Sequence, residues 1–267
     1  MEQNFTKQPQ TPITQEEKYE FPTEEVTLPS KGLLYPEGHP LRSGVIKLKY
    51  MTAREEDILT NSNYIKNGTV INKLLQSVIV TPIDYNDLLI GDKNSILIAA
   101  RILGYGSDYT FKYTDPSNGD EEEITIDLTE LDDKELDESL MVEGRNEFAF
   151  TLPYSKIDIT FKLLTHGDEE KIQKELKGLK KINKFSSAEL TTRLKYAIIS
   201  VNGDRDTKTI REFVDNRLLA RDSKAFRNYL GEMMPDIDME VDIEFESGAS
   251  AEGVSIPLGI NFFWPDA

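Results

Sequence analysis

Few residues in this 267-residue chain could do acid–base or nucleophilic chemistry, since it has two histidines and no cysteine. His39 lies between Gly38 and Pro40, and His166 lies in the first turn of a predicted helix. The missing thiols exclude cysteine nucleophiles and thiolate metal sites, and two histidines alone cannot build the usual zinc sites. Neither a glycine-rich phosphate loop nor a nucleophile elbow occurs. We therefore predict no catalytic residues and no cofactor.

One segment has the spacing of a calcium loop. Residues 202–206 read Asn-Gly-Asp-Arg-Asp, with oxygen ligands at alternate positions as at the start of an EF-hand. However, Thr207 stands where that loop needs glycine, and Phe213 stands where it needs glutamate. We interpret the segment as a polar turn before a helix over 209–219, and we predict no metal site.

The acids of the chain, whose net charge is −17, are concentrated in two segments. Residues 115–143 hold thirteen Asp and Glu against one Lys, and residues 236–252 hold seven acids and no base. Bases gather in 171–195, which we interpret as the solvated face of an amphipathic helix. This balance disfavours nucleic acid and favours protein partners. With no membrane-spanning apolar stretch and no signal-peptide pattern, we expect a soluble, unsecreted protein.

The order of predicted elements repeats within the chain. The string VTLPS at 26–30 is echoed by FTLPY at 150–154, and VIKLKYMT at 45–52 is echoed by DITFKLLT at 158–165. Each longer string alternates as a strand does and ends on a threonine. An acid follows that threonine after three residues, which is typical of a strand that leads into a capped helix.

Later elements recur in the same order. Apolar residues have helical spacing in each copy, at 73–80 and 88–98 and again at 193–200 and 218–227. Asp92 and Asp222 are candidate caps of the last of these helices. Alternating apolar residues then predict an acidic β-hairpin in each copy, with a turn-rich tip between its two strands.

We therefore predict an α+β fold with two tandem copies of a strand–helices–β-hairpin module. The expected organisation is a flexible N-terminal arm at 1–25, a first α+β repeat at 26–131, an acidic linker at 132–149 and a second α+β repeat at 150–267.

The last residues form an aromatic cluster that contains the only tryptophan. Such a cluster either docks into its own domain or anchors a partner, where aromatic side chains supply much of the binding energy. Internal docking is the default expectation, and the sharper hypothesis is partner binding by Phe262, Phe263, Trp264 and Pro265.

Three strings, VTLPSKGLLYP, IKLKYMTAREEDIL and IPLGINFFWPD, together resemble the T4-type baseplate hub subunit and hub-assembly family of contractile-tailed phages. The resemblance covers most of 26–267. Within the first string, Leu28, Pro29 and Tyr35 complete the predicted partner-binding set. Members of this family often carry C-x-x-C pairs in the hairpins. In this chain Asp115 and Asn118, and likewise Ser247 and Ser250, occupy those positions, which removes any inherited zinc.

The resemblance implies a non-enzymatic tail protein that is made in the bacterial host cytoplasm. It would build the central hub of the baseplate through contacts with other hub proteins and the tape-measure protein, as a structural component or as an assembly factor. An alternative is a hub-assembly chaperone that is absent from the mature virion. Retention in the virion tail and homo-oligomer formation are left open.

Two interpretations outside this class are weighed against it. A divalent-metal hydrolase would need carboxylates that converge on one pocket, whereas the acids alternate along 238–246 and project from one solvent face. A soluble binding adaptor outside phages is the other interpretation.

Overall fold

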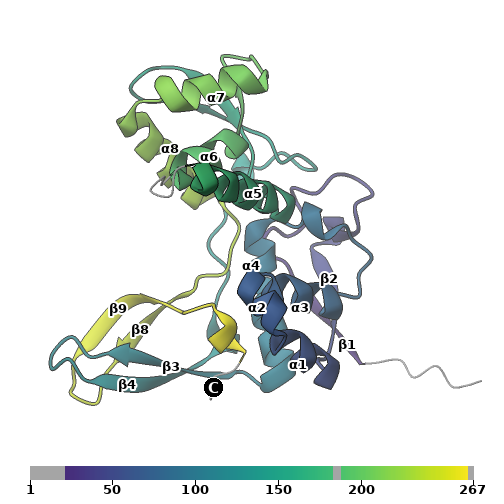
Figure 1. Cartoon of the computed structure of the whole chain (residues 1–267), viewed down its shortest axis with the longest axis vertical. Helices are drawn as coiled ribbons and strands as arrows, with labels where there is room; N and C mark the ends of the chain where they lie inside the picture. The colour runs from purple at the N-terminus through teal and green to yellow at the C-terminus, as the bar shows by residue number, and fades with distance from the viewer. Residues whose placement is uncertain (1–21, 183–187, 264–267) are drawn as a thin grey trace, which may run out of the picture.

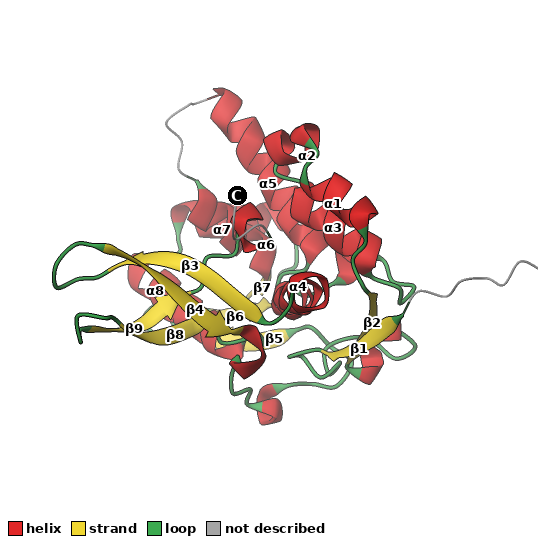
Figure 2. Ribbon diagram, turned by 90° about the horizontal axis from the view of Figure 1, so that it is seen from below, coloured by secondary structure: helices red, strands yellow, loops and turns green. Residues whose placement is uncertain are grey.

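The structure is a computed structural model that describes residues 22–182 and 188–263 (Figure 1). Helices and antiparallel sheets are mixed in it, which confirms the predicted α+β class. The chain forms an N-terminal lobe, a C-terminal lobe, and a pair of β-hairpins that lie side by side (Figures 1 and 2). We call this pair the double hairpin.

The N-terminal lobe begins with an antiparallel pair of strands, in which Val26 lies opposite Ile46. These strands are β1 (Thr23–Thr27) and β2 (Val45–Lys49), and the helices are α1 (Ala53–Leu59), α2 (Ser62–Asn67), α3 (Val70–Val78) and α4 (Ile90–Tyr105). Leu74 and Leu75 of α3 are fully buried, because apolar residues recur at helical spacing and face the core. β1 starts inside the segment predicted as a flexible arm, and the rest of that arm, 1–21, lies outside the described residues.

The C-terminal lobe contains a three-stranded antiparallel sheet with β6 in its centre. Its strands are β5 (Phe148–Thr151), β6 (Asp158–Phe161) and β7 (Ile198–Val201), and its helices are α5 (His166–Ile182), α6 (Glu189–Ala197), α7 (Thr207–Asn216) and α8 (Ala220–Met233). The ring of Phe161 packs on Phe148 at 5.3 Å and on Phe226 at 5.1 Å. These rings join the sheet to α8 and form the centre of the lobe.

The double hairpin combines one hairpin from each half of the sequence. Its strands are β3 (Asp108–Thr114), β4 (Glu121–Asp127), β8 (Glu240–Glu244) and β9 (Ser250–Ser255). In the first hairpin Phe111 lies opposite Ile124, and in the second Val241 lies opposite Val254. Within each hairpin the apolar side chains of the two strands therefore lie on the same face, as their alternation in the sequence predicts.

The junction between β2 and α1 is a capping box. The Thr52 side chain accepts from the helix N-terminus, and the Thr52 backbone N–H donates to Glu55 Oε2 at 2.9 Å. Glu55 is fully buried and also accepts from Lys49 Nζ at 2.8 Å and Ser77 Oγ at 2.6 Å. Burial alone would raise the pKa of Glu55, but these hydrogen bonds outweigh it and lower the pKa to about 2.

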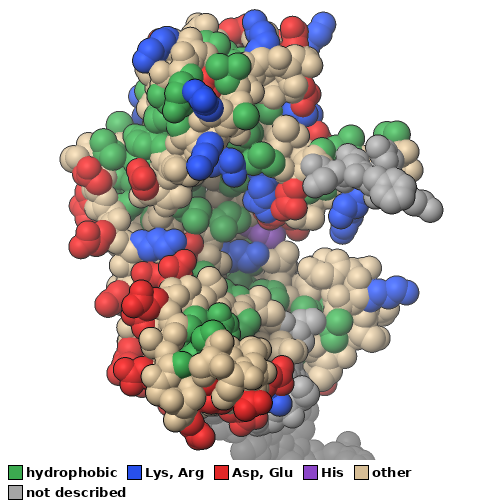
Figure 3. Space-filling model, turned by 90° about the vertical axis from the view of Figure 1, so that its left-hand side faces the viewer, with side chains coloured by type: hydrophobic (Ala, Val, Ile, Leu, Met, Phe, Trp, Pro, Cys, Tyr) green, Lys and Arg blue, Asp and Glu red, His purple; other side chains and the backbone are tan. Residues whose placement is uncertain are grey.

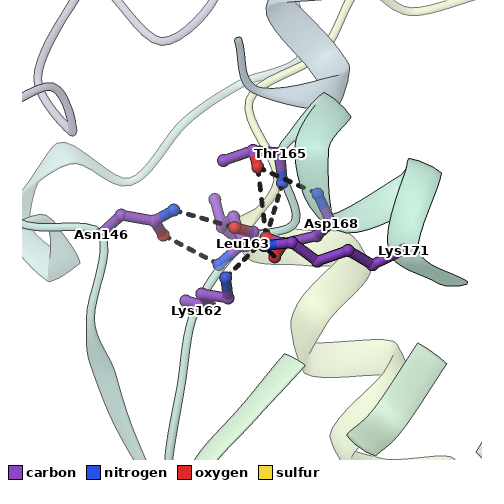
Figure 4. Close-up of polar contacts among 6 residues, drawn as sticks. All are labelled: Asn146, Lys162, Leu163, Thr165, Asp168 and Lys171. Atoms are coloured by element: carbon purple, nitrogen blue, oxygen red, sulfur yellow. Dashed lines mark hydrogen bonds and ion pairs between the residues drawn. The ribbon is translucent and has the colours of Figure 1, made fainter. Parts of the chain in front are cut away.

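The junction between β6 and α5 has matching contacts (Figure 4). Asp168 Oδ2 accepts from the Thr165 backbone N–H at 3.2 Å and from Lys162 Nζ at 2.6 Å, while Thr165 Oγ1 accepts from the Asp168 N–H at 3.3 Å. Asn146 holds the strand end by exchanging two hydrogen bonds of 2.8 Å with the backbone of Leu163. The shorter aspartate therefore replaces glutamate in the second box.

A second pair of contacts links each proline-containing turn to the first turn of a later helix. Asp92 in α4 accepts from the Ser30 backbone N–H at 2.9 Å and from Ser30 Oγ at 2.7 Å. Asp222 in α8 accepts from the backbone N–H groups of Tyr154 at 2.8 Å and Ser155 at 3.0 Å. Neither aspartate caps its own helix as predicted, because both lie inside the first turn and turn outward to the preceding loop. These contacts and the order of elements recur in the two halves of the chain, and the duplication itself stays a prediction.

The two lobes are joined by backbone pairing near the start of α4. The His166 N–H donates to the Leu88 carbonyl at 2.8 Å, and the Ile90 N–H donates to the Leu164 carbonyl at 3.3 Å. Asn94 Nδ2 adds a hydrogen bond of 3.0 Å to Asp236 Oδ1, in the connection from α8 to β8. The segments 88–94, 164–166 and 235–236 therefore meet where the lobes touch.

Glu55→Gln is expected to lower the free energy of unfolding by about 2 kcal/mol at pH 7. The folded pKa of about 2 lies below the ordinary value of 4.5, so this stabilisation is present above pH 4.5 and is lost as the pH falls toward 2. Urea denaturation should show a large difference in the free energy of unfolding between the variant and the unmodified protein at pH 7. At pH 3 the difference should be small. Glu56→Gln, an exposed neighbour in α1, is the control and should have little effect at either pH.

Candidate protein-interaction surfaces

The two histidines are placed as structural residues. The His166 ring is buried against Tyr85, with ring centroids 4.4 Å apart, and burial together with nearby Lys93 lowers its pKa. His39 Nδ1 accepts from the Leu41 N–H at 3.1 Å, and its ring stacks on Tyr35 at 4.8 Å. The other ring nitrogen of His39 lies 3.6 Å from Asp87 Oδ2, and His166 Nε2 lies 3.4 Å from Glu170 Oε1.

The calcium-like segment 202–206 is the polar turn that its sequence favours. Asn202 and Gly203 both have positive φ, and Asp206 caps α7 by accepting from the Thr209 N–H at 3.2 Å. The helix begins at Thr207, two residues earlier than predicted. Across residues 22–182 and 188–263, no group of three or more His, Asp and Glu side chains is placed to hold a metal ion.

The two hairpins of the double hairpin contact each other near their tips. The Tyr113 and Phe245 rings stack with centroids 6.1 Å apart, and the tips meet where Ser117 Oγ and Ser247 Oγ lie 3.3 Å apart. The Glu246 N–H also donates to Glu122 Oε2 at 3.0 Å. The acidic segments of the two halves, which are more than a hundred residues apart in sequence, therefore form one surface.

This surface is strongly acidic. Residues 108–127 and 238–255 hold thirteen Asp and Glu and one base, Lys112. In β8 and its flanks the acids alternate with buried or half-buried residues, and each of these acids faces solvent: Asp238, Glu240, Asp242, Glu244 and Glu246. Figure 3 shows Asp and Glu side chains gathered over the hairpin part of the molecule. The predicted solvent face is therefore present, and its acids spread outward rather than converge on a pocket.

The aromatic residues near the end of the chain dock internally as far as the structure describes them. Phe262 and Phe263 are fully buried, and Phe262 packs edge-to-face on Tyr109 at 4.8 Å. Arg101 Nε donates to the Phe262 carbonyl at 2.9 Å. Both phenylalanines therefore pack inside the protein, as the default expectation has it. Trp264 and Pro265 lie outside the described residues.

The candidate partner-binding residues near the first turn are also buried: Leu28, Pro29 and Tyr35. The Tyr35 hydroxyl donates to Asp92 Oδ2 at 2.7 Å and accepts from the Leu89 N–H at 3.1 Å. Burial raises the pKa of Tyr35 and of Asp92, while the hydrogen bonds from Ser30 and Tyr35 favour the charged carboxylate. Within the described structure these residues hold a turn against α4.

Arg101 is an organising residue that the sequence patterns did not single out. It is almost fully buried in α4, and besides Phe262 it donates to the carbonyls of Gly106 at 2.7 Å and Asp108 at 3.0 Å. It therefore fixes both the start of the first hairpin and the turn after the second. An arginine inside the apolar run ILIAARILGY was the available signal, because a buried guanidinium needs several acceptors.

The sequence model of the T4 bacteriophage base plate protein family matches residues 22–264. The chain belongs to this family. No curated relative and no solved structure matches it. The match includes both lobes and the double hairpin of this baseplate protein, and therefore every residue that the structure describes. In the described part of the chain, no helix has both the length and the apolar character needed to cross a membrane.

Proposed function

We propose that this baseplate protein is a non-enzymatic component or assembly factor of the central hub that acts through protein–protein contacts. Family membership supports the baseplate role, and the acidic double hairpin is the observation that supports docking to other proteins. A surface with thirteen acids and one base attracts partner segments rich in Lys and Arg. The partners we propose are other hub proteins and the tape-measure protein.

The arrangement of the acids argues for docking and against hydrolysis. A divalent-metal hydrolase needs carboxylates fixed around a shared ion, whereas the exposed acids of β8 follow one another along a solvent face. Because like charges repel, gathering so many acids on one surface works against folding, and this favours a role for the surface in binding. A basic partner neutralises the surface and docks faster because of it.

The proposal includes two versions that differ in the fate of the protein. A structural component stays in the tail of the virion, whereas a chaperone for the tape-measure protein acts in the host cytoplasm and leaves. Affinity capture from infected cells should recover hub or tape-measure proteins in either version. Mass spectrometry of purified virions separates them, since a retained component appears there and a chaperone does not. Capture of neither partner class would contradict the proposal.

Neutralising the solvent face of β8 is expected to slow partner association about tenfold at low salt. The variant carries Asp238→Asn, Asp242→Asn and Glu244→Gln, whose amide oxygens still accept hydrogen bonds such as that from Gly253 to Asp242. The difference should shrink as salt rises, because screening weakens attraction between exposed charges. Surface plasmon resonance with the captured partner gives the rate.

The control neutralises three exposed acids elsewhere, by Glu56→Gln, Asp57→Asn and Glu212→Gln. Both variants should keep the melting temperature of the unmodified protein, because removing clustered like charges costs the fold nothing. Equal association rates for the two variants would show that the double hairpin is not the docking surface.

A further inference from the structure

An open apolar groove lies on the C-terminal lobe, separate from the acidic surface. It has a volume of about 260 Å³ and is bounded by α6, α8 and the segment Lys162–Leu164 that follows β6. Six apolar side chains form most of its wall: Leu163, Leu164, Leu190, Leu194, Leu230 and Met234. Leu190 is 43% exposed, so part of this apolar wall faces solvent.

The rim of the groove is basic. Lys162, Arg193 and Arg227 line it, and no Asp or Glu does. Lys162 pairs with Asp168, and Arg193 pairs with both Glu169 and Glu189. Arg227 has no carboxylate partner within the described ranges and donates to the Ser223 carbonyl at 3.3 Å. Figure 3 shows hydrophobic side chains beside Lys and Arg side chains in the upper part of the molecule, which is the C-terminal lobe of Figure 1.

A basic rim is unusual on a chain with a net charge of −17. It selects for an occupant that carries negative charge beside apolar side chains. Two neighbouring helices that leave an apolar groove between them provide the setting in which amphipathic helices bind, with anchors about one helical turn apart. The cavity admits a few side chains, whereas a stable dimer buries about 800 Å² on each partner. The groove by itself therefore fits a segment and not a second folded copy.

We infer that this groove binds a short amphipathic, acidic segment of a partner protein, whose apolar side chains enter between α6 and α8 and whose carboxylates face Arg227. The inference deepens the proposed function, on which it rests, by giving the protein a second docking site of opposite charge preference. The double hairpin would take basic segments, and the groove would take acidic ones.

Two fluorescent peptides of about 14 residues test the inference with the full-length protein. Both carry leucines at i, i+4, i+7 and i+11, and the remaining positions hold mainly glutamate in one peptide and lysine in the other. Fluorescence anisotropy at low salt should show that the acidic peptide binds, with an affinity that falls as salt rises because the basic rim attracts its carboxylates. The lysine peptide is expected on the acidic hairpins, so its binding should not change in variants of the groove. No binding of the acidic peptide at low salt would overturn the inference.

Two variants locate the binding. Arg227→Glu should weaken the acidic peptide about tenfold, and Leu190→Asp should weaken it by a similar factor through the apolar wall. The matched controls are Lys208→Glu, an exposed base on α7, and Leu140→Asp, whose leucine is 44% exposed outside the groove. The inference would be overturned if the control variants lost binding of the acidic peptide, or if both groove variants still bound it with unchanged affinity.

Other occupants give different results. Self-association in sedimentation velocity that Leu190→Asp abolishes would show that a second copy covers the groove. Displacement of the acidic probe by a synthetic peptide of residues 1–21 would show that the chain's own first residues do. Either result would show that the occupant of the groove is not a segment of a partner protein, and would overturn the inference. Groove binding in a protein that captures no baseplate partner would instead contradict the proposed function and leave the groove assignment standing.

Discussion

Gly91→Ala is expected to lower the free energy of unfolding by about 3 kcal/mol or more. A Cβ at Gly91 would lie 1.6 Å from the Pro235 carbonyl oxygen and 2.7 Å from its carbon. This connection cannot move away freely, because the Asp236 carbonyl accepts from the Lys134 N–H at 2.8 Å and its side chain accepts from Asn94. The clash therefore forces apart the place where the two lobes meet.

The control for this prediction is Gly178→Ala in α5, where nothing lies within 4 Å of the added carbon. Alanine is a better helix former than glycine, so this change should raise the free energy of unfolding by about 0.5–1 kcal/mol. Urea denaturation of both variants gives the comparison. Two variants of equal stability would contradict the close approach of α4 to the connection after α8.

Deletion of residues 262–267 is expected to cost several kcal/mol and to release the double hairpin from α4. Phe262 and Phe263 are fully buried, and loss of a buried aromatic side chain costs about 3–5 kcal/mol. The deletion also removes the carbonyl that accepts from Arg101. Amide hydrogen exchange should show lost protection in β3 and β8, together with a lower melting temperature.

A shorter deletion separates stability from partner binding. Removing only 264–267 keeps both phenylalanines and takes away Trp264 and Pro265, the two candidate partner-binding residues whose role stays a prediction. We expect this variant to keep its melting temperature and to capture less of its partner. An unchanged melting temperature in the longer deletion would contradict internal docking of Phe262 and Phe263.

Local signals in the sequence predict many of the elements correctly. The threonine and acid at Thr52 and Glu55 mark the start of α1, and the spacing of Leu74, Leu75 and Val78 marks the buried face of α3. Alternation along 109–113 and 241–245 likewise predicts β3 and β8. These features depend on residues a few positions apart, so a single sequence contains the information.

Contacts between distant residues could not be predicted in this way. Nothing in the strands themselves indicates that β3–β4 and β8–β9 lie side by side, because that depends on the path of the chain from α8 past Gly91. Asp92 and Asp222 have the sequence position of helix caps, but a turn far away in the sequence supplies their donors. The groove beside Leu190 and Arg227 depends in the same way on the packing of two helices.

The proposed function assigns specificity in assembly to two surfaces of the protein. Its acids are exposed on a pair of hairpins that are joined by the stacked rings of Tyr113 and Phe245, and Arg101 holds the start of the first hairpin and the turn after the second. Electrostatic attraction over such a surface guides the approach of a partner, while apolar contacts determine how long it stays. We assign the first of these roles to the double hairpin and the second to the groove.

The most direct test of the central claim is complementation of a phage that lacks this gene. Cells supplying the unmodified protein should yield particles with complete baseplates, counted by electron microscopy. Cells supplying the folded variant with Asp238→Asn, Asp242→Asn and Glu244→Gln should yield far fewer, while the three-residue control variant restores them. Full restoration by the hairpin variant would contradict assembly through the acidic double hairpin.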